Sequence, residues 1–287
     1  MKAYLDLLAD VLQNGSRQSN RTGIDAISLP GAMLKFDLAE GFPAVTTKKL
    51  AWKAVVGELV GFLRGCDNAA EFRALGCNVW NQNANENKQW LANPNRKGED
   101  DLGRIYGVQW RQWKGENGRV VDQVTNVLNT LRTNPTDRRI IVSAWRPDEF
   151  DQMALPPCHV LYQFIANVER NELNLCMYQR SCDLFLGVPF NIASAALFLS
   201  VVAHITGFKP RFFTHFLADA HVYVNHVDQV SEQISREPRN PPKLVINNIP
   251  AFDGTNFDPT WIDRLDPADF VLEGYDPHPA IKAPMAV

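Results

Sequence analysis

A cysteine and a histidine stand side by side, directly after two prolines, in the stretch MALPPCHVLYQF from Met153 to Phe164. Each proline fixes its backbone φ angle, so the Cys158 side chain is presented in a set direction and does not lie on a flexible loop. A thiolate is a strong nucleophile, which makes Cys158 a candidate for covalent catalysis. The alternative is that Cys158 is a small core residue and His159 an ordinary core or surface histidine, and the rest of the chain must decide.

A thiol becomes a nucleophile only when its surroundings lower its pKa, which is about 8.5 when free. The segment YQRSCDLFLGVPFN places Arg180 and Ser181 at the end of a predicted strand. If strands 158–166 and 172–179 pair as a hairpin, the Arg180 guanidinium lies beside the Cys158 thiol. Three more arginines suit a phosphate dianion through their forked donors, although each could equally be a solvated surface residue: Arg21, Arg138 and Arg139.

Several polar side chains fall at positions that indicate binding or proton transfer. Glu58 lies on the apolar face of a predicted helix, where it is either half-exposed at the helix edge or buried, and burial would raise the pKa of its carboxyl and let it move protons. Asn191 begins a buried helix, where it either caps the helix or reads a uracil ring through its amide. His221 and Tyr223 alternate on one face of a predicted strand and favour a sugar site. The histidine spacing matches no zinc pattern, so the sequence predicts no metal site.

The periodicity of apolar residues predicts the elements that must position these side chains. Amphipathic helices are expected over 4–12, 51–65 and 120–133, and a helix that is apolar on nearly every side is expected over 192–205. Strands are expected over 139–145, 158–166 and 172–179, and two more within 26–38, joined by a turn at Pro30-Gly31.

Helices and strands mix along the chain without a steady βαβ alternation. We therefore predict a single α+β domain over residues 1–287, with a large mixed sheet covered by helices. The stretch 81–101 is rich in Asn and charge, so it is expected to be an exposed insertion with a short helix near 88–91.

The composition is that of an ordinary soluble globular protein, with 45% hydrophobic residues and a formal net charge of −3 over 287 residues. A slightly acidic chain does not coat nucleic acid or anionic membranes, so any anion must be held by specific arginines. The apolar run 192–205 is too short and too interrupted to span a bilayer, and acidic residues near the N-terminus argue against a signal peptide, so we predict a cytoplasmic protein. The five cysteines are scattered without a CxxC pair, which is typical of reduced thiols.

Six motifs, taken together, resemble the thymidylate synthase family nearly from end to end. They are RTG at Arg21, GFPAVTTKK at 41–49, LPPCH, QRSCDLFLGVPFNIAS, DAHVYVNH, and GYDPHPAIKAPMAV at 274–287. The resemblance implies reductive methylation of dUMP to dTMP, with 5,10-methylenetetrahydrofolate as co-substrate, dihydrofolate as the second product and no metal. It also implies the thymidylate synthase fold, assembled as a sheet-to-sheet homodimer.

The resemblance assigns each candidate a role. Cys158 would attack carbon 6 of the pyrimidine and so activate carbon 5 to capture the one-carbon unit. The catalytic residues that it implies are Cys158, Glu58, Tyr106, His159, Arg180, Asp183 and Asn191.

It also implies two binding sites. The nucleotide site comprises Arg21, Arg180, Ser181, Asp183, Asn191, His221 and Tyr223, with Arg138 and Arg139 supplied by the other subunit. The folate site comprises Lys48, Val79, Trp80, Asp183, Leu186, Gly187, Phe190 and Ala286, with the C-terminal residues closing over the folate.

Departures from the family pattern fall mainly in the implied folate site and keep other functions open. Many members have WDEW where this chain has Trp80-Asn81-Gln82-Asn83, and this loss of an aromatic wall leaves a dUMP hydroxymethylase as an alternative, in which water takes the place of hydride. A regulatory module that binds nucleotide or RNA without catalysis is a further alternative, against which the filled catalytic positions argue. A cysteine hydrolase is disfavoured, because the adjacent residues Cys158 and His159 point to opposite faces of a strand.

Overall fold

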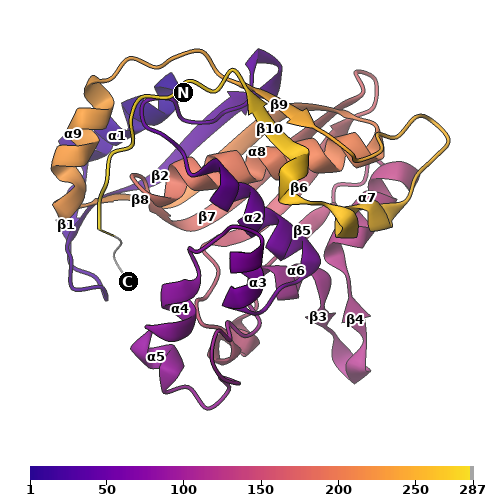
Figure 1. Ribbon diagram of the computed structural model, residues 1–287, viewed down its shortest axis with the longest axis horizontal. Helices are drawn as coiled ribbons and strands as arrows, with labels where there is room; N and C mark the ends of the chain where they lie inside the picture. Colours follow the sequence, from indigo (N-terminus) through magenta and orange to yellow (C-terminus); the bar gives the residue numbers. More distant parts are fainter. Residues whose placement is uncertain (285–287) are drawn as a thin grey trace.

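A six-stranded sheet forms the centre of the molecule in the computed structural model, which describes residues 1–284 (Figure 1). Its strand order is β1-β2-β8-β7-β6-β5, with bounds Ser16–Gln18 for β1, Ala26–Asp37 for β2, Ile141–Ser143 for β5, His159–Asn167 for β6, Glu172–Asp183 for β7 and Lys209–Tyr223 for β8. Neighbouring strands are antiparallel except β7 and β8, which are parallel. A parallel pair requires a crossover connection, and a long helix supplies it here.

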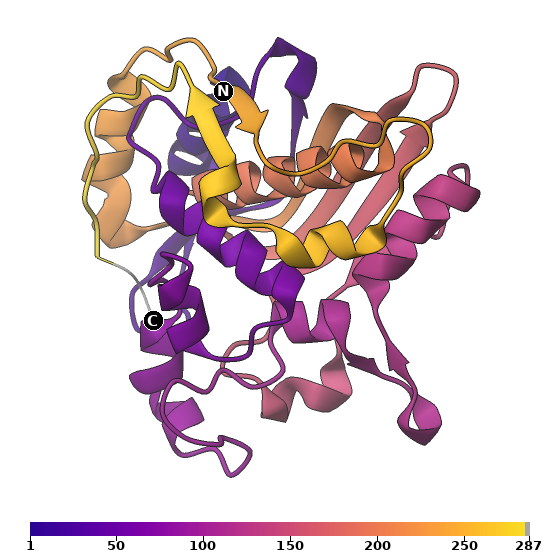
Figure 2. The same cartoon turned by 45° about the vertical axis from the view of Figure 1, so that its right-hand side comes forward.

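Helices pack against one face of this sheet, as Figures 1 and 2 show from two directions. The α-helices of residues 1–284 are α1 (Lys2–Asn14), α2 (Trp52–Arg64), α3 (Ala69–Ala74), α4 (Asn81–Asn85), α5 (Lys88–Leu91), α6 (Tyr106–Arg111), α7 (Gln123–Thr133), α8 (Gly187–Thr206) and α9 (Val227–Ser235). The main contacts with the sheet come from α1, α6, α7 and α8. Two small two-stranded sheets complete the fold, β3 (Trp113–Lys114) with β4 (Val120–Val121) and β9 (Lys243–Ile246) with β10 (Phe270–Glu273). The predicted α+β architecture with a large mixed sheet is confirmed.

Helix α8 connects β7 to β8 and lies in the core. It is long and apolar enough to cross a membrane, with a mean hydropathy of 1.8, but 83% of that stretch is buried inside the protein. The predicted helix over 192–205 is therefore confirmed as a core helix, and it begins earlier than expected, at Gly187. Phe198 stacks on Trp110 of α6 with ring centroids 5.3 Å apart, which joins α8 to the layer that carries Tyr106.

Two of the expected element boundaries are wrong. Residues 26–38 form one strand and not two, because Gly31 takes a positive φ of 78° and lets the chain continue past Pro30. Strand β1 pairs only with residues 26–28, so Pro30 lies on an open edge where its missing N–H breaks no ladder. The helix expected over 120–133 begins only at Gln123, because the Asp122 side chain accepts a hydrogen bond from the Thr125 N–H and caps it there.

The stretch 81–101 is more structured than the expected exposed insertion. It contains the predicted short helix, α5, and a second one, α4. Trp90 is 2% exposed and its indole N–H donates to the Asp101 carbonyl at 2.7 Å, so the expectation of exposure is wrong for this side chain. Asp100 pairs with Arg73 of α3, which ties the end of the stretch back to the main body.

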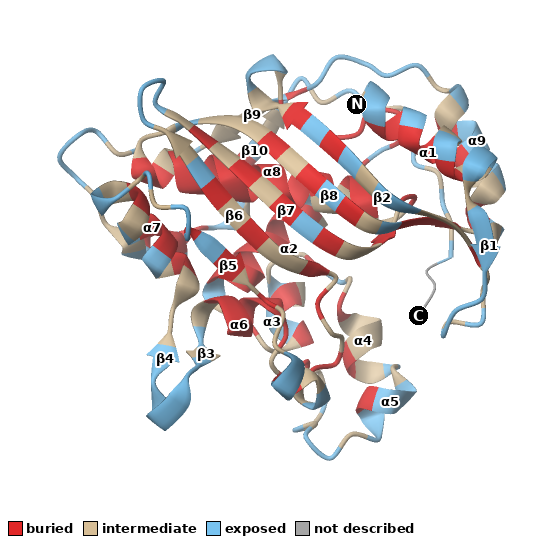
Figure 3. Cartoon of the chain, turned by 180° about the vertical axis from the view of Figure 1, so that it is seen from behind, coloured by how far each residue is buried: buried red, intermediate tan, exposed pale blue. Residues whose placement is uncertain are grey.

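No helix within residues 1–284 covers the opposite face of the sheet, as the view from behind shows (Figure 3). Met33, Phe216 and Tyr178 lie next to one another across β2, β8 and β7, and their exposed fractions are 60%, 39% and 42%. Ile165 of β6 adds a fourth exposed apolar side chain. Large apolar side chains therefore gather on the open face of a sheet whose other face is buried.

Candidate active site

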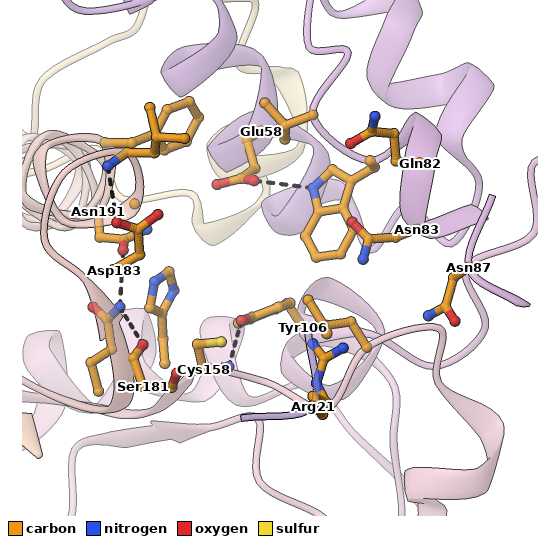
Figure 4. Close-up of a pocket in the computed structure, with 18 of the residues that line it drawn as sticks. Arg21, Glu58, Gln82, Asn83, Asn87, Tyr106, Cys158, Ser181, Asp183 and Asn191 are labelled. Atoms are coloured by element: carbon orange, nitrogen blue, oxygen red, sulfur yellow. Dashed lines mark hydrogen bonds between the residues drawn. The ribbon is translucent and has the colours of Figure 1, made fainter. Parts of the chain in front are cut away.

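One cavity of about 660 Å³ opens where β6 begins, β7 ends and α8 starts (Figure 4). Most of the residues predicted from the sequence line it together: Arg21, Glu58, Val79, Trp80, Tyr106, Cys158, His159, Ser181, Asp183, Leu186, Gly187, Phe190, Asn191, His221 and Tyr223. These residues come from segments far apart in the chain, and the sheet with its crossover helix brings them to one place.

Cys158 immediately precedes β6, and Figure 4 shows its sulfur pointing into the cavity beside the Tyr106 side chain. Its backbone N–H donates to Tyr106 Oη at 2.6 Å. Burial raises the pKa of the thiol, while the charge of Arg180, the Tyr106 hydroxyl and the charge of Arg21 each lower it. Arg180 therefore lowers the pKa of the thiol as expected, but burial outweighs it and the net pKa is raised, so the group is a thiol at neutral pH.

Arg180 is not among the cavity-lining residues of the described chain but lies behind Cys158. Its backbone N–H donates to the Cys158 carbonyl at 2.9 Å, as the predicted hairpin of β6 and β7 requires. Its Nε donates to the Pro157 carbonyl and its Nη2 to the Pro156 carbonyl, both at 2.9 Å. The guanidinium thus fastens the two-proline segment to β7, and this fixes the direction of the Cys158 side chain.

Glu58 occupies the buried face of α2 and is 6% exposed. Burial raises the pKa of its carboxyl to about 8, although the Trp80 indole N–H, which donates to Oε1 at 3.1 Å, lowers it in part. At neutral pH the group is mostly protonated, because the pH lies below this pKa. Of the two positions expected for Glu58, half-exposed or buried, the structure shows the buried one, and the carboxyl can give up and recover a proton near neutral pH.

Tyr106 and His159 form the floor beside Cys158. Burial raises the pKa of the Tyr106 hydroxyl well above its usual value, so this group stays protonated. Burial lowers the pKa of His159 to about 4, and its Nδ1 is 3.1 Å from the Tyr162 hydroxyl. Both rings are therefore neutral, and they can donate or relay hydrogen bonds without adding charge.

Asn191 does not cap α8, because the helix begins before it. Its Oδ1 accepts a hydrogen bond at 3.0 Å from Nε2 of Gln179, a cavity-lining residue that the sequence analysis missed. Gln179 is 2% exposed and follows Leu173, Leu175 and Met177 on the inward face of β7. Every second residue of this strand points inward and is apolar until the series reaches Gln179. A polar side chain at the next inward position needs a buried hydrogen-bond partner, and this could have identified Gln179 from the sequence.

One end of the cavity is formed by residues of β8. The parallel register places His221 opposite Asp183, and the His221 and Tyr223 ring centroids are 5.2 Å apart. Although burial lowers the pKa of His221, its contacts with Asp219 raise it overall. Asp183 Oδ1 accepts from the backbone N–H groups of Phe185 and Leu186 at 3.0 and 3.2 Å, so it also holds the turn that leads into α8.

Besides Arg180, four of the predicted residues lie outside the cavity or outside the described chain. Lys48 contacts the Phe185 ring and carbonyl, and burial lowers the pKa of its amine to about 7. Arg138 and Arg139 precede the edge strand β5 and are exposed, and Arg139 pairs with Asp137 at 2.8 Å. Ala286, with the closing C-terminus, falls outside the described residues.

The other end of the cavity is lined by Val79 and Trp80 and by the start of α8, at Leu186 and Phe190. The stretch from α4 to α5 adds polar residues that the sequence analysis did not assign to the site: Gln82, Asn83, Glu86, Asn87, Lys88 and Gln89. Residues 1–284 contain no group of three or more His, Cys, Asp or Glu side chains that could hold a metal ion. This end offers apolar surface with an amide-rich rim, which suits a large, partly polar ligand.

The α+β scaffold presents a cysteine, a protonated carboxyl and an oriented amide to one cavity. This combination is typical of enzymes that use a cysteine nucleophile. The thymidylate synthase family model matches residues 2–287. A thymidylate synthase of Pseudomonas putida is 52% identical, and those of Pseudomonas syringae pv. tomato and Bordetella parapertussis are each 49% identical, with the whole of both chains covered in every case. The chain belongs to the thymidylate synthase family.

Proposed function

We propose that this protein catalyses the reductive methylation of dUMP to dTMP with 5,10-methylenetetrahydrofolate as co-substrate. The family match and the full-length relatives at 49–52% identity support this methyltransferase over the hydroxymethylase and over a non-catalytic module. The observation that carries the chemistry is the position of Cys158, with its sulfur in the cavity, Tyr106 beside it and Arg180 behind it.

We infer that the nucleotide binds with its pyrimidine between Cys158 and Asn191. Cys158 forms a bond from Sγ to carbon 6 of the ring, and the negative charge that develops is delocalised toward the 4-oxygen. The thiol must lose its proton first, and the charges of Arg180 and Arg21 favour the thiolate that remains. Arg21, Ser181 and Arg180 are proposed to hold the phosphate, and His221 and Tyr223 the sugar.

Glu58 is proposed to move protons at the ring. Because its pKa is about 8, it can donate a proton toward the 4-oxygen as charge develops there, and take it back when the ring is restored. Asn191 is proposed to distinguish uracil from cytosine, with Oδ1 accepting the ring N–H and Nδ2 donating to the 4-oxygen.

The residues at the other end of the cavity fit a folate. Trp80, Val79, Leu186 and Phe190 offer apolar and aromatic walls for a flat ring system, and the cavity volume leaves room for it beside a nucleotide. When bound, methylenetetrahydrofolate supplies the one-carbon unit and the hydride. We propose that the walls hold its ring against the pyrimidine and exclude water, with Gly187 and Asp183 at the junction and Lys48 and Ala286 toward its tail.

We further propose a homodimer in the cytoplasm, with the two open sheet faces packed together. The exposed apolar side chains of Met33, Phe216 and Tyr178 support this assembly, because such a face is stabilised by removal from water. Arg138 and Arg139 lie at the sheet edge, away from the cavity of their own chain, so they are available to reach the nucleotide phosphate of a second copy.

A product assay tests the proposed function. Purified protein is incubated with dUMP and methylenetetrahydrofolate, the nucleotide product is identified by mass, and dihydrofolate is followed by absorbance. We expect dTMP and dihydrofolate in equal amounts. A hydroxymethylated nucleotide without dihydrofolate would contradict methylation.

A further inference from the structure

A chain of buried hydrogen bonds runs from the cavity into the core at Asn191. Nε2 of Gln179 donates to Asn191 Oδ1 at 3.0 Å and to the Ser181 carbonyl at 2.9 Å, and Gln179 Oε1 is 2.8 Å from Nε2 of His215. His215 lies on β8, is fully buried, and is not among the described residues that line the cavity. It takes no part in the proposed reaction.

The direction of every hydrogen bond in this chain follows from one backbone group. The Ser181 carbonyl can only accept, so the Gln179 atom facing it must be the amide nitrogen. The Gln179 oxygen then faces His215, which obliges His215 Nε2 to carry a proton and donate it. At the other end, the Gln179 nitrogen requires an oxygen from Asn191, so Asn191 Nδ2 is left to donate elsewhere.

The surroundings of His215 keep it in this one form. Its Nδ1 is buried and has no hydrogen-bond partner within residues 1–284, so a second ring proton would be left unpaired away from water. Burial lowers the pKa of the ring well below its usual value. The ring stacks on Phe213, with centroids 5.6 Å apart, and this holds Nε2 toward Gln179. His215 is therefore a neutral ring with a single donor aimed at Gln179.

We propose that His215 is a positioning residue that fixes the orientation of the Asn191 amide and thereby selects a 4-keto pyrimidine over a 4-amino one. This inference rests on the proposed binding of the pyrimidine at Asn191. With Oδ1 accepting and Nδ2 donating, the amide matches the N–H and 4-oxygen of uracil. The reversed amide matches the ring nitrogen and 4-amino group of cytosine instead. Without a donor at position 215, Gln179 Oε1 is buried without a partner, and the Ser181 carbonyl alone is left to hold the orientation of the Gln179 and Asn191 amides.

Two measurements test this inference. First, long-range proton–nitrogen NMR of the wild-type protein reports the ring tautomer, and we expect a proton on His215 Nε2 and none on Nδ1. Second, calorimetric titration compares the dissociation constants of dUMP and dCMP for three variants. His215→Phe keeps a ring beside Phe213 but removes the donor, His215→Gln returns an amide donor, and His204→Phe removes a histidine that bonds the Ile249 carbonyl, at the far end of α8 from Asn191.

We expect the preference for dUMP over dCMP to fall roughly tenfold in His215→Phe, the effect of about one hydrogen bond, to recover in His215→Gln, and to stay unchanged in His204→Phe. A purely structural role would lower the melting temperature of His215→Phe and leave the preference intact, which contradicts the inference. A proton on Nδ1 in the wild-type protein contradicts it too, even if His215→Phe does not fold. A wild-type protein that does not prefer dUMP contradicts the proposed function, and the tautomer measurement is independent of that result.

Discussion

The two ends of the cavity are built in different ways. At the nucleotide end, Cys158 directly precedes β6, Ser181 lies on β7 and Asn191 on α8, and hydrogen bonds through Arg180 and Gln179 hold them. At the other end, much of the wall comes from the short helices α4 and α5, whose side chains at Gln82 and Asn83 are only half-buried. The reacting atoms therefore lie on a rigid scaffold, and the rim that faces the second substrate has more freedom to vary.

The largest effect is expected at the nucleophile. Cys158→Ser replaces the thiolate with a poorly nucleophilic hydroxyl, so dTMP formation should fall on the order of 10⁴-fold or more while dUMP still binds. Initial rates and dUMP titration measure the two quantities. Cys176→Ser, at a half-buried cysteine on β7 outside the cavity, is the matched control and should retain wild-type activity.

The next effect is expected at the proton donor of the nucleotide end. Glu58→Gln keeps the size of the side chain and removes its titration, so kcat should fall by about 10²- to 10³-fold, with dUMP affinity little changed. A variant that retains wild-type kcat would show that proton transfer does not pass through Glu58.

Glu58 also predicts how stability depends on pH. Its pKa rises from 4.5 to about 8 on folding, so it stabilises the fold fully below pH 4.5 and progressively less as the pH rises toward 8. Denaturant unfolding should show the wild type losing stability relative to Glu58→Gln across this window, at up to about 1.4 kcal/mol per pH unit. Parallel pH profiles for the two proteins would refute the buried, protonated carboxyl.

A smaller effect is expected where the two ends meet. Trp80→Phe keeps an aromatic wall but removes the N–H that donates to Glu58, and this hydrogen bond lowers the pKa of the carboxyl. The alkaline limb of the kcat profile should therefore move to higher pH, and kcat should fall roughly fivefold. An alkaline limb that moves to lower pH would mean that another group titrates there.

The smallest effect is expected at the amide-rich rim. Asn83→Ala should raise the KM for methylenetetrahydrofolate roughly threefold and leave the KM for dUMP unchanged, because Asn83 faces only the far end of the cavity. Asn95→Ala is the matched control, since Asn95 lies in the same stretch and bonds Asp151 away from the cavity. An equal rise in both KM values for Asn83→Ala would remove the distinction between the two ends.

The sequence predicted the elements with strong periodicity and missed the features that depend on pairing. The core helix α8 and the hairpin of β6 and β7 follow from apolar patterns and are confirmed. The pattern placed Glu58 on the apolar face of α2 but did not decide between partial exposure and the burial that the structure shows. The continuous β2 was missed, because Pro30-Gly31 is a turn signal unless an open sheet edge accommodates it. The net pKa shift of Cys158 could not be predicted. The nearness of Arg180, which lowers the pKa, can be inferred from the sequence, but the extent of burial, which raises it more, cannot. Gln179 and His215 were missed because their partners are far apart in the chain.

The covalent bond between Cys158 and carbon 6 of the nucleotide can be tested most directly with 5-fluoro-dUMP. Fluorine at carbon 5 cannot leave as a proton does, so the complex with methylenetetrahydrofolate should stop while still attached to the protein. Intact mass spectrometry should show one nucleotide and one folate added per chain, and peptide mapping should place both on the fragment that contains Cys158. An unmodified chain, or an adduct on another residue, would contradict the assignment of the nucleophile.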